Sequence, residues 1–241
     1  MAIFFLAKFI KKQEHADEFL QGKLFLNPLC YFKNIESEDG RGDKNEGAIL
    51  FPLDDFVLTL TPTNPKTGDV GDIIRITKDD LAAPISLHPG RFDHINLLCM
   101  YACHIRDIQS ISVDNIDDFR KQLEISEECA SLGEHAIIIT NIQEFLRRIS
   151  VAAEQGGYGL RRGLVTYYDP MVGTPTTESD IESVFHKRKE YQYQSEFRIA
   201  VDTHLYEPTS LRLSIGDISD IAFLMRTSEI NGQMRFEVGP R

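Results

Sequence analysis

Hydrophobic residues recur along the chain with a helical spacing in some segments and a strand-like spacing in others. The clearest helix is predicted over 142–154, where Phe145, Leu146 and Ile149 fall on one helical face and Gly156 follows the last turn. Further helices are predicted over 11–21, 116–123 and 181–185.

Short apolar or alternating runs bounded by Gly, Pro and Asn predict strands. The predicted strands cover 2–9, 23–26, 48–52, 55–61, 71–77, 94–103, 135–140, 163–168, 195–201, 210–214, 220–225 and 233–238. Strands follow one another in runs instead of alternating with helices, so the pattern favours an α+β protein with a mixed or largely antiparallel sheet and a few flanking helices. No internal repeat or low-complexity linker divides residues 1–241, which predicts a single domain.

Charge changes this picture by limiting the partners. The chain has 26 basic and 37 acidic residues, a net charge of −11, which argues against a surface devoted to duplex DNA. Acidic residues gather in the first half, as at Asp114, Asp117, Asp118, Glu124, Glu127 and Glu128, where a protein partner is one interpretation and a solvated face is the other. The run Lys187-Arg188-Lys189 in the second half would attract a phosphate-bearing small molecule.

The N-terminal and cysteine patterns indicate a cytoplasmic protein. The opening apolar run over 3–6 is too short for a signal peptide, and no stretch is long enough to cross a bilayer. With no export signal, the four cysteines are expected to be free thiols in a reducing compartment.

Cys99, Cys103 and His104 resemble a fragment of a metal site, but the predicted strand separates them. Two of them, Cys99 and Cys103, share one face of a strand, and His104 points to the other. No second cysteine pair completes a tetrahedral set, so no metal site is expected.

A polar loop over 36–46 contains Asp43 and Glu46 at a spacing of three residues. Such a pair can bind a cation or act as acid and base, and it can equally be two solvated carboxylates. Both interpretations stay open.

The segment 190–201 begins polar and aromatic and continues as an alternating strand. Because side chains alternate between the faces of a strand, Glu196 and Arg198 are adjacent on one face. If this strand is central, both charges must pair with each other or meet a ligand, since burial of an isolated charge is unfavourable. A structural salt bridge is the alternative.

Several short motifs resemble a bacterial and phage family known as domain of unknown function 2971. The matching stretches are Gly42-Asp43-Lys44-Asn45-Glu46, Leu97-Leu98-Cys99-Met100-Tyr101, Gly163-Leu164-Val165-Thr166-Tyr167, Lys187 or Lys189 followed by Tyr191-x-x-Gln194-x-Glu196-Phe197-Arg198, and Ile218-Ser219-Asp220-Ile221-Ala222-Phe223-Leu224. The family's Trp and first Glu are replaced here by Tyr191 and Gln194. The resemblance implies an intracellular protein linked to mobile elements or phage defence, with no established activity.

Gln194-Ser195-Glu196 also resembles the Gln/Glu-x-Glu motif of NAD-dependent ADP-ribosyltransferases, although that family's Ser-Thr-Ser strand has no counterpart here. The resemblance implies that Glu196 orients the nicotinamide ribose of NAD and that Gln194 orients the acceptor.

The leading hypothesis is therefore a nucleotide- or NAD-dependent transferase, and the alternative is a non-catalytic, acidic protein-binding module. For the transferase, the predicted catalytic residues are Glu196, Gln194 and Arg198, and the predicted ligand-binding residues are Asp43, Glu46, Lys187, Arg188, Lys189 and Tyr193.

Overall fold

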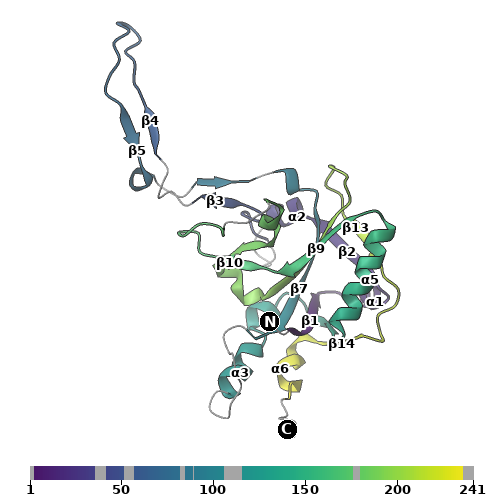
Figure 1. Cartoon of the computed structure of the whole chain (residues 1–241). Helices are drawn as coiled ribbons and strands as arrows, with labels where there is room; N and C mark the ends of the chain where they lie inside the picture. Colours follow the sequence, from purple (N-terminus) through teal and green to yellow (C-terminus); the bar gives the residue numbers. More distant parts are fainter. Residues whose placement is uncertain are drawn as a thin grey trace.

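A central antiparallel sheet organises the protein, and helices pack on both of its faces (Figure 1). The computed structural model describes residues 3–35, 42–51, 57–81, 85–88, 90–105, 116–175 and 180–235. The predicted α+β fold with a largely antiparallel sheet is confirmed. No helix in the described part of the chain has the length and apolar character needed to cross a membrane.

The central sheet contains eight of the described strands, and their order is β13-β2-β7-β1-β8-β14, with β12 and then β9 on the other edge of β7. These strands are β1 (Ile3–Ile10), β2 (Lys23–Pro28), β7 (Asn96–His104), β8 (His135–Ile139), β9 (Gly159–Leu164), β12 (Glu196–Asp202), β13 (Leu211–Ser214) and β14 (Ala222–Arg226). Strand β12 is therefore interior, because it pairs with both β7 and β9.

Strands β1 and β2 both pair with the same edge of β7, and a gap between them lies opposite the middle of β7. The β1 pairing ends where Ala7 lies opposite Tyr101, and the β2 pairing begins where Asn27 lies opposite Leu97. Residues 98–100 of β7 have no strand partner on this edge among the described pairings. The sheet is consequently split between β1 and β2.

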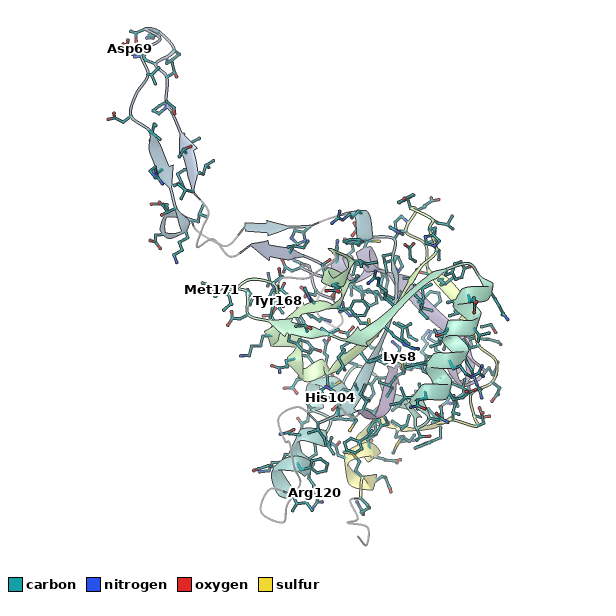
Figure 2. All side chains as sticks on the ribbon, in the orientation of Figure 1. Lys8, Asp69, His104, Arg120, Tyr168 and Met171 are labelled. Carbon is teal, nitrogen blue, oxygen red and sulfur yellow. The ribbon has the colours of Figure 1, made fainter. Side chains whose placement is uncertain are left out.

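Lys8 partly closes this split with a side chain. Its Nζ donates a hydrogen bond of 2.7 Å to the backbone carbonyl of Cys99, in the middle of the open edge. A buried carbonyl without a partner is unfavourable, so this contact replaces one missing bond of the strand ladder. Figure 2 labels Lys8 in this central region.

The helices divide between the two faces of the sheet. They are α1 (Gln13–Leu20), α2 (Leu29–Asn34), α3 (Ile116–Leu123), α4 (Glu127–Ala130), α5 (Ile142–Gln155) and α6 (Ile230–Gln233). On one face, α1 and α5 bury Phe19 and Phe145 against Leu98 and Phe197. We call the opposite face the site face; residues of α3, α4 and α6 pack on one part of it, and α2 with the 3₁₀ segment η4 (Asp180–Phe185) covers another.

Among the described strands, three pairs lie outside the central sheet: β3 (Ile49–Phe51) with β6 (Ile85–Leu87), β4 (Leu58–Leu60) with β5 (Ile74–Ile76), and β10 (Thr166–Tyr168) with β11 (His186–Arg188). The β4–β5 hairpin projects away from the central sheet, with Asp69 near its tip (Figures 1 and 2). Residues 57–75 are exposed throughout, so this hairpin contributes no side chain to the core.

Most predicted elements correspond to observed ones, and three differences have a local cause. The predicted strand 163–168 is instead the end of β9 and the separate strand β10, which belong to different sheets. The predicted strand 233–238 is wrong at its start, because Gln233 is the last residue of α6. Residues 236–238 of that predicted strand lie outside the described residues. The predicted loop residues 36–41 and Asp114 also lie outside them. Helix α2 was not predicted, because its six residues after a proline are too few to show a helical repeat of hydrophobic positions.

Candidate functional site

The interior strand β12 carries two charged side chains on the site face of the sheet. Glu196 lies opposite Tyr101 of β7, and Arg198 lies opposite Cys99, as the period of two residues requires. Their exposed fractions are 5% and 1%, so both charges are removed from water.

Arg198 is held by two carboxylates at once. Its Nε lies 2.6 Å from Glu196 Oε1, and its Nη1 lies 2.7 Å from Glu46 Oε1. Nη1 also donates to the backbone carbonyl of Val184. Planar guanidinium groups favour such multiple contacts, so Arg198 fixes the two carboxylates relative to each other.

Lys187 of β11 completes the cluster. Its Nζ donates a 2.8 Å hydrogen bond to Gln194 Oε1 and lies 3.3 Å from Glu196 Oε2 and 3.6 Å from Glu46 Oε2. The same ammonium group lies 4.9 Å from the centroid of the Tyr191 ring, a favourable cation–π position. We call Glu46, Lys187, Glu196 and Arg198 the buried charge cluster; its two positive and two negative charges balance.

The balance of charges determines how these groups titrate. Burial acts to raise the pKa of Glu196, but the positive charges of Arg198 and Lys187 outweigh it and hold that pKa well below its ordinary value of 4.5. Burial acts to lower the pKa of Lys187, and Glu196 and Glu46 outweigh it, so that pKa is raised. Glu196, Lys187 and Arg198 are therefore charged at neutral pH.

A strained backbone residue positions Gln194 and Glu196. Ser195, between them, has φ of 42°, in the left-handed region that non-glycine residues rarely adopt. Its Oγ donates a 2.8 Å hydrogen bond to the Ala102 carbonyl, and the Ala102 amide donates to the Ser195 carbonyl at 2.7 Å. These bonds to β7 stabilise the turn from the 3₁₀ segment η5 (Lys189–Gln194) into β12.

A pocket of about 670 Å³ lies above the buried charge cluster and runs along the split between β1 and β2. Glu46, Lys187, Gln194, Glu196 and Arg198 line its inner part. The size is within the range of small-molecule pockets.

The outer part of this pocket is rich in positive charge. We call the five lysines and arginines of the lining outside the buried charge cluster the outer cations; they are Lys8, Lys11, Lys12, Lys23 and Arg212. Lys8 is partly buried and donates to the Cys99 carbonyl, and the other four are exposed. They come from β1, the link between β1 and α1, β2 and β13. The pocket thus combines a neutral, ion-paired inner part with a basic outer part.

The other predicted site residues lie beside the pocket and do not line it. Asp43 is buried, and its Oδ1 accepts a 2.8 Å hydrogen bond from the Asn45 amide, while no described residue bonds its buried Oδ2. The Tyr193 hydroxyl accepts a 3.3 Å bond from Gln194 Nε2. Arg188 is partly buried near Tyr168, and Lys189 is exposed. Of the basic run 187–189, only Lys187 lines the pocket.

The outer cations were not among the predicted site residues. The signal in the sequence is modest: in a strongly acidic chain, lysines at positions 11 and 12 begin the first predicted helix and lysines at 8 and 23 lie on either side of it. Their convergence depends on the split in the sheet, which no local pattern encodes.

The cysteines of the site face are poor nucleophiles. Cys99 lines the pocket, but burial and then the negative charge of Glu196 raise its pKa far above the ordinary value. Burial raises the pKa of Cys103 to about 12. In the described ranges, no group of three His, Cys, Asp or Glu side chains is placed to hold a metal ion.

Acid titration provides a test of the buried charge cluster. Because the folded-state pKa of Glu196 is lowered, its carboxylate stabilises the fold above its unfolded pKa, and this stabilisation is lost as the pH falls through the folded pKa. We expect Glu196→Gln to be less stable than the unmodified protein at pH 7, and the difference to shrink steadily below about pH 4.5. Urea unfolding at a series of pH values measures it.

Glu144→Gln is the control for this titration. Its carboxylate pairs with Arg147 and Arg148 on the exposed face of α5, and these partners lower its pKa to about 2. Surface pairs contribute little, so the Glu144→Gln difference should be small and should vanish in high salt. A pH-independent loss in Glu196→Gln would contradict a charged Glu196.

Comparison with known proteins does not identify a family for this chain. Family models, curated proteins and solved structures give no match to the chain. The resemblance to domain of unknown function 2971 and the resemblance to the ADP-ribosyltransferase motif therefore stay predictions.

Proposed function

We propose that this protein binds a phosphate-bearing small molecule in the pocket between β1 and β2. The observation that carries the proposal is the charge of the lining: seven lysines and arginines and three glutamates, in a chain whose net charge is −11. A basic concave surface on an acidic protein concentrates anions locally.

The positive charge is concentrated where a ligand would enter. The buried charge cluster neutralises itself, so the excess comes from the outer cations, which Glu18 alone opposes among the described lining residues. Lysines and arginines on both sides of the split can contact separate oxygens of one phosphate chain.

The same charges favour a small anion over a nucleic acid duplex. Duplex binding requires an extended basic surface, whereas here seven of the 26 lysines and arginines line one pocket and the rest of the chain is acidic overall. The acidic surface repels long polyanions and leaves small ones able to enter.

Transfer chemistry on NAD or a nucleotide is the second candidate. It is supported by Gln194 and Glu196, which line the same pocket as the outer cations. In this version Glu196 would act while paired with Arg198 and Lys187, whose positive charges keep it ionised. The alternative of a non-catalytic protein-binding module predicts no small-molecule affinity.

Calorimetric titration with inorganic triphosphate, and separately with NAD, tests the proposal. We expect triphosphate to bind and its affinity to fall steeply between about 50 mM and about 300 mM NaCl, because the contacts are ionic. A variant with Lys12→Ala and Lys23→Ala should weaken triphosphate binding by about tenfold, since each lost charge removes roughly half of the corresponding binding free energy.

A variant with Lys44→Ala and Lys66→Ala is the matched control, because it removes the same charge from exposed positions outside the pocket. It should bind triphosphate like the unmodified protein. Equal weakening in both variants would indicate a general charge effect and reject the pocket, and absence of binding by either anion would support the protein-binding module.

A further inference from the structure

Two aromatic side chains of the pocket lining are exposed to solvent although they are large and apolar. Phe25 is 51% exposed and Tyr31 is 46% exposed, and both line the pocket that holds the outer cations. Exposed aromatics are unremarkable singly, but a pair in a concave basic site matches the composition of a ligand surface.

Phe25 faces the pocket because of the alternation along β2. Its neighbours Leu24 and Leu26 are 1% exposed and enter the core on the other face of the sheet. The Arg212 guanidinium, directly across the ladder on β13, lies 5.9 Å from the centroid of the Phe25 ring. One outer cation is thus held beside an open aromatic ring.

Tyr31 is presented by the short helix α2. Its ring packs edge to face against Phe32, with centroids 5.5 Å apart and an interplanar angle of 87°. This contact restrains the ring while leaving it half exposed. The pocket lining also includes Asn27, whose Oδ1 accepts a 3.0 Å hydrogen bond from the Ser210 hydroxyl and whose Nδ2 is a hydrogen-bond donor.

We propose that Phe25 and Tyr31 form a base-binding subsite, so that the ligand of this pocket is a nucleoside polyphosphate. This inference rests on the proposed function and specifies its ligand class. The base stacks on the aromatic rings of β2 and α2, and the phosphate chain lies among the outer cations. Stacking on an aromatic side chain tolerates any base, and the adjacent Arg212 adds an attraction for the stacked ring.

Competition between a nucleotide and its phosphate chain alone isolates the subsite. ATP and inorganic triphosphate are titrated into the full chain by calorimetry in metal-free buffer. We expect ATP to bind about tenfold more tightly than triphosphate, because only ATP stacks. Phe25→Leu, which keeps an apolar side chain, should weaken ATP by about tenfold and leave triphosphate binding unchanged.

Phe223→Leu is the control, because Phe223 of β14 is 49% exposed and lies outside the pocket lining. It should change neither affinity. As an independent readout, the fluorescence of etheno-ATP should be quenched on binding to the unmodified protein and less quenched with Phe25→Leu.

The outcomes separate the two proposals. Equal affinities for ATP and triphosphate, unaffected by Phe25→Leu, would reject the base subsite and leave the anion pocket standing. Binding of neither compound would reject both. Loss of triphosphate binding in Phe25→Leu would also reject the base subsite, because the ring would then be supporting the outer cations.

Discussion

Replacing Arg198 by methionine is expected to destabilise the protein by about 3–5 kcal/mol, the usual cost of breaking a buried ion pair from one side. Arg198 is 1% exposed and neutralises Glu46 and Glu196, so its removal leaves these two carboxylates facing Lys187 alone. Methionine keeps much of the volume, which separates the charge effect from a cavity. Urea unfolding at pH 7 gives the free energy of unfolding.

The loss should depend on pH in a direction fixed by the charges. Without Arg198, burial dominates the titration of Glu196 and raises its folded-state pKa. When the pKa of Glu196 is higher in the folded than in the unfolded state, the unfolded state loses its proton first as the pH rises, and this favours unfolding. The loss of stability in Arg198→Met should therefore grow from acidic to neutral pH. A deficit that stays constant across this range would contradict the assignment.

A double variant distinguishes charge imbalance from a mere loss of packing. Adding Glu46→Gln to Arg198→Met restores neutrality, with Lys187 opposite Glu196, and should recover part of the lost stability. Arg161→Met, on the exposed part of the neighbouring strand β9, should change stability by less than about 0.5 kcal/mol. No recovery in the double variant would show that Arg198 acts through its packing.

The pairing of Glu196 and Arg198 on one strand face could be predicted from the sequence, but their partners could not. The alternation of Phe197, Ile199 and Val201 fixes which residues share a face, because a strand has a period of two. Lys187 and Glu46 reach the same point from a two-stranded sheet and an irregular loop, and no periodicity relates these segments to β12. Long-range contacts of this kind depend on the tertiary arrangement.

The edge strand β9 shows why some boundaries were misplaced. Arg161 and Arg162 are exposed, and among the described pairings β9 has one strand neighbour, β12. Polar residues in an edge strand weaken the apolar signal, so the strand was expected to begin only at Gly163. The pocket could not be predicted for a similar reason, since four of the five outer cations are exposed and have the local pattern of solvated surface residues.

Helix α5 is the opposite case, because its local pattern and its tertiary environment agree. The Asn141 side chain caps its first turn by accepting a 3.1 Å hydrogen bond from the Glu144 amide. Phe145, Ile149 and Ala153 are buried, as their helical spacing requires. Truncation of a buried side chain on α5 should therefore destabilise the protein strongly.

Phe145→Ala is expected to cost about 3–5 kcal/mol, the range for removing a buried phenyl ring from a packed core. Phe145 is fully buried, and its ring centroid lies 6.4 Å from that of Phe19 on α1, so one ring joins both helices to the sheet. Phe145→Leu, which retains most of the apolar volume, should fall between the alanine variant and the unmodified protein. Urea midpoints with an unchanged slope provide the measurement.

Val151→Ala on the same helix is the matched control for Phe145→Ala. Val151 is 39% exposed, and alanine has the better helix propensity, so this change should alter the free energy of unfolding by less than about 0.5 kcal/mol. If Phe145→Ala were as mild as Val151→Ala, the ring could not be the contact that fixes α1 and α5 to the sheet. Lys11, Lys12 and Lys23, which flank the two ends of α1, would then need another support to hold their positions, because that helix connects β1 to β2.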